Sequence, residues 1–145
     1  MNPSVNFFQI DELLHYIQPI FTNIAESYDI ARWYIERWHW DEPRLTLTWS
    51  GVDGIGRNMS VFINEENGQP NNLELEINAW MDRDEKKGEV RNRKWRHEIV
   101  RRVSLSLGPP VEELREACDK AYNLVSGWTL ADLTNETQIT PAATA

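Results

Sequence analysis

The chain has 145 residues, of which 41% are hydrophobic, and a formal net charge of −8 at pH 7. This length suits one domain and this apolar content suits a packed core, so the composition argues against disorder throughout. One cysteine excludes an internal disulfide framework, and the longest uncharged apolar runs are too short to span a membrane. The first residues show no signal-peptide pattern, so we expect a cytoplasmic protein of a bacterium-like cell.

The first quarter of the chain has apolar residues at steps of three and four, which is the period of a helix. We expect stacked helical segments from about Ile10 to about Trp38. Pro19 either kinks one long helix or begins a second helix in its first turn, where the missing N–H leaves no hydrogen bond unmade. Pro43 lies just beyond the predicted helical region.

Apolar and polar residues then alternate with period two, which predicts an antiparallel sheet with one apolar, inward face and one polar face. The first three strands are expected at about residues 44–50, 57–65 and 72–82, and their short connections favour a meander. The predicted inward set is Leu45, Leu47, Trp49, Met59, Val61, Ile63, Leu73, Leu75, Ile77, Ala79, Ile99, Val103 and Leu105.

The fourth strand follows a predicted turn at 84–88 and is ambiguous. Residues 95–107 fit a helix with an apolar residue at every fourth position, whereas residues 103–107 alternate strictly, as a strand does. We favour the strand, with a helix over 90–107 as the alternative.

Pairing of this strand with the third one would place Glu76 beside Arg96 and Asn78 beside Lys94 on the polar face, a favourable cross-strand arrangement. Arg101 falls on the apolar side of the alternation, which indicates a β-bulge near Val100.

A second helical stripe runs from Val111 to Trp128, with acidic residues in its first turn and Gly127 near its end. Residues 134–145 are small and polar, so we expect a disordered tail there. The predicted fold is α+β, with a single domain over 1–133. A four-stranded antiparallel meander carries N-terminal (kinked or paired) and C-terminal helices on one face and leaves the other face open.

The open face is the leading candidate for function, because three apolar side chains interrupt its polar pattern and aromatic residues beside arginine often anchor interfaces. The predicted partner-binding residues are Trp80, Phe62, Val100, Arg96, Arg102, Lys94, Glu76, Trp33 and Trp40, of which the last two extend the face or form a homodimer patch. The competing explanation is that a neighbouring segment covers these rings, or that the register is off by one.

Positive charge is concentrated in one segment of this acidic chain. Residues 83–102 hold nine Lys and Arg against four Asp and Glu, a net charge of +5. Cations interleaved with aromatic residues grip phosphates and stack bases, so nucleic-acid binding through the fourth strand is the alternative function. The simpler explanation is that these cations neutralise nearby carboxylates and protect a strand edge from aggregation.

No sequence pattern indicates catalysis. His39, Asp41 and His97 would make a small metal-dependent hydrolase if the helix end met the fourth strand, but their spacing matches no metal motif. Cys118 lies on the apolar stripe of the last helix, where a buried thiol is inert. The glycines of residues 51–56 join two strands, whereas a phosphate cradle opens a helix.

We therefore expect no cofactor and no metal. The leading hypothesis is a non-enzymatic protein–protein interaction module, such as an adaptor, an inhibitor, an immunity-type protein or a client-specific chaperone.

Overall fold

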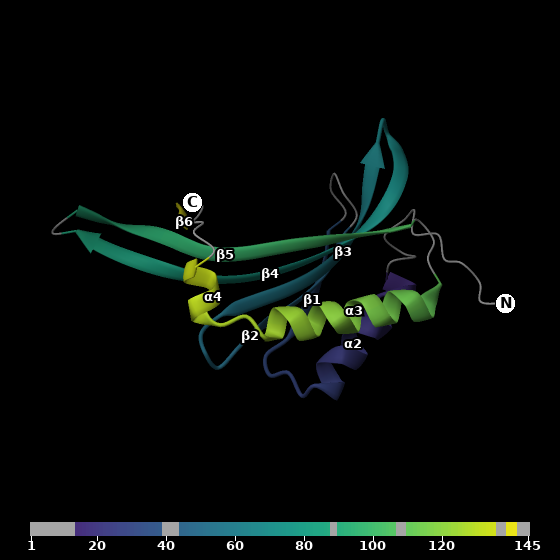
Figure 1. Cartoon of the computed structure of the whole chain (residues 1–145), viewed down its shortest axis with the longest axis horizontal. Helices are drawn as coiled ribbons and strands as arrows, with labels where there is room; N and C mark the ends of the chain where they lie inside the picture. The colour runs from purple at the N-terminus through teal and green to yellow at the C-terminus, as the bar shows by residue number, and fades with distance from the viewer. Residues whose placement is uncertain (1–13, 39–43, 88–89, 107–109, 136–138, 142–145) are drawn as a thin grey trace.

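A computed structural model describes residues 14–38, 44–87, 90–106, 110–135 and 139–141, and it shows an antiparallel sheet with helices beneath it (Figure 1). Within these ranges the strands lie side by side in chain order. They are β1 (Tyr34–Trp38), β2 (Arg44–Ser50), β3 (Gly56–Glu66), β4 (Gln69–Lys87), β5 (Val90–Ser106) and the short β6 (Ile139–Pro141). The helices are α2 (Gln18–Ser27), α3 (Val111–Ser126) and α4 (Leu130–Asn135). The α+β class is confirmed, but the sheet has more strands than the four expected.

The additional strand β1 replaces the second half of the predicted N-terminal helical stretch. Pro19 lies in the first turn of α2, as in one of the two predicted alternatives. Beyond α2 the backbone of Asp29 and Arg32 has positive φ, 51° and 54°, which breaks the helical ladder. Over residues 31–38 the apolar positions fit both a helical stripe and a short alternation, and Ile35 joins the sheet as a β-branched residue.

β5 is a strand along its whole length and pairs with β4, so the helical alternative over 90–107 is wrong. The predicted register is also wrong: Glu76 faces Arg102, and Asn78 faces Val100. The reason is the position of the hairpin end. β4 continues to Lys87, so the centre of the turn lies about three residues later in the chain than predicted. In an antiparallel hairpin, a shift of the turn by one residue changes the partner of each residue by two positions, so Glu76 faces Arg102 and not Arg96.

The predicted bulge near Val100 is absent, because the pairing of β4 with β5 shifts only between Glu85 and Lys87. Arg101 simply stands on the apolar face of a regular strand, where its side chain is exposed. No bulge is needed, since the helices do not cover this end of β5.

The hydrophobic core lies between the apolar face of the sheet and helices α2 and α3. The predicted inward residues of β2, β3 and β4 are buried, as is Ile99 of β5. Val103 is an exception with 52% exposure, and Leu105 is only partly buried. The described part of the chain contains no helix that is long and apolar enough to cross a membrane.

The far end of the β4–β5 hairpin projects beyond the helices as a two-stranded arm (Figure 1). The short β6 pairs with residues 95–97 of β5, at the base of this arm. The expected disordered tail is therefore wrong in part, because α4 extends to Asn135 and residues 139–141 form a strand. Strand pairing of this kind uses backbone groups and needs no apolar pattern in the sequence.

Candidate interaction surface

The polar face of the sheet, where the partner site was predicted, is largely occupied by its own cross-strand contacts. The hydroxyl groups of Thr46 and Ser60 lie 2.8 Å apart and both residues are buried. Ser104 donates a 2.8 Å hydrogen bond to Glu74 from the neighbouring strand. These contacts follow from the register, which sets Thr46 opposite Ser60 and Glu74 opposite Ser104.

Phe62 lies on this face, as predicted, because the register sets it opposite Arg44 and Glu74, but its side chain is only 2% exposed. The guanidinium carbon of Arg44 lies 4.4 Å from the ring centroid, and that of Arg102 lies 5.4 Å from it. The same two arginines reach Glu76, with Arg44 Nη1 at 3.6 Å and Arg102 Nε at 2.6 Å from its carboxylate oxygens. One carboxylate therefore holds two cations against one aromatic ring.

This cluster brings together three predicted residues, Phe62, Arg102 and Glu76, but they contact one another and leave the ring inaccessible. Sequence reasoning missed Arg44. The only signal was its place at the start of the first predicted strand; the register that sets Arg44 opposite Phe62 comes from the structure.

Trp80 is half-buried because its indole lies against the backbone of the facing strand. A methyl group at Gly56, its partner in the register, would lie 2.5 Å from the indole carbons Cε2 and Cζ2. Glycine therefore makes room for this ring. Val100 has 37% exposure, so it is the most accessible of the three apolar residues predicted on the open face.

The remaining aromatic candidates are not part of a described surface patch. Trp33 is partly buried and packs against the hydrophobic core. Trp40 lies outside the described residues, as do His39 and Asp41 of the hydrolase hypothesis.

Lys94 and Arg96 lie in the projecting arm, where only the backbone is described. The register places opposite charges at facing positions three times, in the pairs Asp82–Arg96, Asp84–Lys94 and Glu85–Arg93. Opposite charges at facing positions stabilise a strand pair that has little core to support it. This arrangement favours the simpler explanation of the basic segment, neutralisation by carboxylates of the neighbouring strand.

Exposed apolar side chains also lie on the other face of the sheet, beside α3. A groove of about 320 Å³ separates α3 from strands β4 and β5. Val103 of β5 and Leu124 of α3 both line it and are each 52% exposed. The charged side chains of its lining are balanced, with Arg101 and Lys120 against Glu113 and Glu116. The sequence pattern placed Val103 in the core, but α3 does not reach it.

β5 also presents an open strand edge next to this groove. Its inner side pairs with β4, whereas on its outer side β6 pairs only with residues 95–97. In the described ranges, residues 98–106 thus have no strand beside them on the outer side. The ladder is regular here, and Val100 and Val103 are exposed on opposite faces of the strand. An edge of this length and regularity is able to pair with another extended chain.

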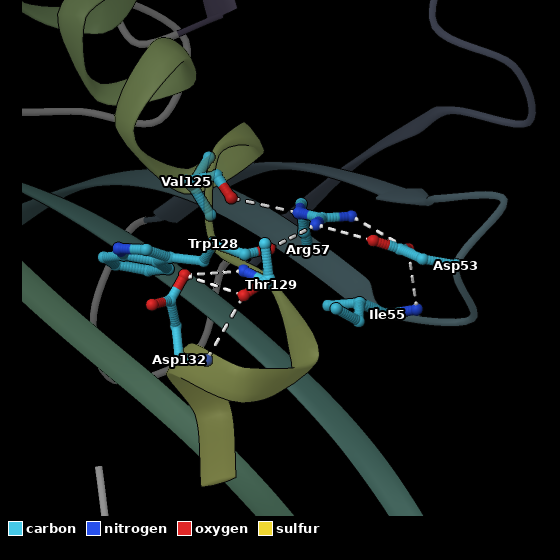
Figure 2. Close-up of polar contacts among 7 residues, drawn as sticks. All are labelled: Asp53, Ile55, Arg57, Val125, Trp128, Thr129 and Asp132. Atoms are coloured by element: carbon cyan, nitrogen blue, oxygen red, sulfur yellow. Dashed lines mark hydrogen bonds and ion pairs between the residues drawn. The ribbon is translucent and has the colours of Figure 1, made fainter. Parts of the chain in front are cut away.

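Arg57 holds the C-terminal end of α3 against the sheet and so positions one wall of the groove (Figure 2). The arginine is 5% exposed; its Nε donates to the Val125 carbonyl at 3.0 Å and its Nη2 to the Trp128 carbonyl at 2.7 Å. Nη2 also lies 3.1 Å from Asp53 Oδ2, and the hydrogen bonds from Arg57 lower the pKa of the Asp53 carboxyl. A positive charge at a helix C-terminus is favourable as well.

Metal and thiol chemistry find little support among the described residues. There, no three His, Cys, Asp or Glu side chains gather closely enough to hold a metal ion. Cys118 is fully buried on α3, as its place in the apolar stripe predicted, and burial raises the pKa of its thiol to about 12. The thiol therefore stays protonated near neutral pH and is a poor nucleophile.

No family model matches this chain, and no curated protein or solved structure is significantly similar to it. The class defined by the fold is an antiparallel α+β domain in which residues 98–106 of β5 have no described strand on their outer side and lie beside a largely apolar groove.

Proposed function

We propose that the chain is a non-enzymatic protein–protein interaction module that receives an extended segment of its partner along the outer edge of β5. The observation that carries this proposal is the coincidence of the open edge, residues 98–106, with the groove beside it. In strand addition, main-chain hydrogen bonds supply affinity, and every second side chain of the added segment enters a pocket that supplies specificity.

The dimensions of a sheet support this arrangement. An added strand would lie about 4.8 Å from β5, with every second side chain directed to the same face as Val103 and Leu105. Apolar side chains of the partner would there contact the exposed Val103 and Leu124. Val100 and Arg102 belong to this edge, whereas Trp33 packs against the core and Phe62 is buried beneath Arg44 and Arg102.

The substitution Val103→Lys is expected to reduce recovery of the partner about fivefold or more, because it places a charge where an apolar contact is proposed. The measurement is recovery of one identified protein by the immobilised chain from extracts of its own cells. Val52→Lys is the matched control, since Val52 is fully exposed in the β2–β3 turn, away from the groove. Equal recovery by wild type and Val103→Lys would contradict the proposal.

Nucleic-acid binding is a second candidate because the projecting arm carries net positive charge. Residues 83–96 hold seven Lys and Arg and three Asp and Glu. Since the register sets acidic residues opposite several of these cations, we expect no saturable binding of a fluorescent single-stranded oligonucleotide at physiological salt. Binding that falls steeply with salt, and that is lost in the double variant Lys94→Gln, Arg96→Gln, would instead favour this candidate.

A further inference from the structure

We infer that the segment received by β5 is the same strand of a second copy of this chain, paired antiparallel about a twofold axis through Val103. This inference rests on the proposed function, because it uses the same strand edge. A twofold axis makes such a contact isologous: one surface patch meets itself, so the patch must be complementary to its own copy.

The charges of β5 select the register. A twofold axis perpendicular to the sheet sets the residue on the axis opposite its own copy, and residues equally distant from the axis then face each other. An axis through Arg101 or Arg102 would set that arginine opposite itself, which is destabilising. An axis through Val103 sets valine opposite valine, Arg101 opposite Leu105, and Arg102 opposite Ser104.

This register is also the longest one that the open edge allows without an arginine opposite itself. With the axis at Val103, residues 100–106 of the two copies face one another. An axis at residue 101 or 102 would match or exceed this length but would set an arginine opposite itself, and an axis at residue 100 or beyond residue 103 shortens the pairing. Its central contact joins two side chains that are 52% exposed in the single chain. Burial of two exposed valines against each other favours association.

The two arginines nearest the axis are already engaged within their own chain. Arg102 Nε lies 2.6 Å from a Glu76 carboxylate oxygen, which offsets its charge on the polar face. Arg101 donates a 2.9 Å hydrogen bond to the Val100 carbonyl, and its guanidinium carbon lies 5.9 Å from the centroid of the Trp128 ring. Repulsion across the seam is thereby reduced on the polar face, where Glu76 offsets the charge of Arg102.

The pairing would also join the two grooves. A twofold axis perpendicular to the sheet keeps the same face of both copies on the same side. Because each groove lies between α3 and the outer strands, the two β5 strands would form the floor of one wider trough, with an α3 helix on each side.

Cysteine cross-linking tests this register directly. Val103→Cys would bring the two sulfur atoms together, because facing residues of an antiparallel pair lie within the Cα separation that a disulfide spans. Val100→Cys is the matched control: it is also an exposed valine of β5, but the two copies of residue 100 would be about 20 Å apart along the strands. Native Cys118 contributes little background, since it is buried.

We expect wild type to sediment at twice the monomer mass, and Val103→Lys to sediment as a monomer. Under mild oxidation Val103→Cys should form at least about fivefold more covalent dimer than Val100→Cys, since only the former has its copy within disulfide range. Because residue 103 is half exposed, circular dichroism should show all variants folded.

A wild-type chain that stays monomeric up to its solubility limit overturns the second-copy inference, and so does equal cross-linking at positions 100 and 103. A dimer that persists in Val103→Lys overturns it too. In the monomeric case, recovery of a different protein that depends on Val103 leaves the proposed function in place. Absence of any recovery that depends on Val103 overturns both proposals.

Discussion

Replacement of Arg57 by methionine is expected to lower the free energy of unfolding by about 3 kcal/mol. The guanidinium group donates to the carbonyls of Val125 and Trp128 at 3.0 and 2.7 Å, and Arg57 itself is buried. Methionine keeps the apolar stem but removes both hydrogen bonds. The Val125 carbonyl retains a 3.3 Å hydrogen bond from the Trp128 N–H, whereas the Trp128 carbonyl loses this donor, and a buried polar group without a partner costs about 1–3 kcal/mol. Urea denaturation followed by circular dichroism measures the change.

Two control variants separate the hydrogen bonds of Arg57 from the mere loss of a positive charge. Arg57→Lys keeps the charge but lacks the planar fork that reaches several acceptors at once, so an intermediate loss is expected. Arg37→Met makes the same replacement at an exposed position of β1 and should change stability by less than about 0.5 kcal/mol. An Arg57→Met variant as stable as Arg37→Met would show that this contact does not hold α3 in place.

The pH dependence of the same variant has a defined sign. Arg57 lowers the pKa of Asp53 in the folded chain below its usual value of 3.8. The stability contributed by this ion pair is therefore present above that value and is lost as the pH falls through the lower, folded-state pKa. The contribution is small because the Asp53 side chain is 46% exposed, so most of the difference between wild type and Arg57→Met should persist at acid pH.

Replacement of Phe62 by alanine is the second change expected to have a large effect, a loss of about 3 kcal/mol in unfolding free energy. The ring is 2% exposed beneath the guanidinium groups of Arg44 and Arg102, so its removal leaves a void and takes away the surface on which both cations rest. Phe62→Leu refills part of the volume and should lose only about 1 kcal/mol.

This variant also distinguishes the two assignments of Phe62. If the ring were an exposed partner contact, as the sequence pattern predicted, Phe62→Ala would keep its stability and lose partner binding. The structure leads us to expect the reverse: lower stability, with binding by the folded fraction within about twofold of wild type. Val100→Ala is the control on the same face, and its 37% exposure predicts little change in stability.

Several elements were predictable because their signals are local and long. The alternation over β2, β3 and β4 identified the buried apolar residues of these strands except Phe62, but not the buried polar residues Thr46, Arg57, Ser60 and Glu76. The helical stripe of α3 placed Cys118 in the core. β1 was missed because five residues are too few to separate a period of two from one of three to four. β6 carries no pattern at all, since it is held through backbone pairing with β5.

The candidate site was only partly predictable. The sequence pointed correctly to Val100 and Arg102 as exposed side chains of the last long strand. It placed Phe62 on the correct face but did not show that the ring is buried, because the two arginines that lie over it come from β2 and β5 and meet only when the sheet is assembled. It also assigned Val103 to the core, although that residue satisfies the alternation on a part of the sheet that α3 leaves uncovered.

The sequence by itself determined which side chains share a face, because alternation along a strand is a property of the local backbone. Only the tertiary structure decided which parts of each face are covered, where β4 and β5 reverse, and that no described strand lies on the outer side of residues 98–106 of β5. These features depend on where α3 and β6 meet the sheet, and those positions are set by contacts between residues far apart in the chain, such as Arg57 with the carbonyls of Val125 and Trp128.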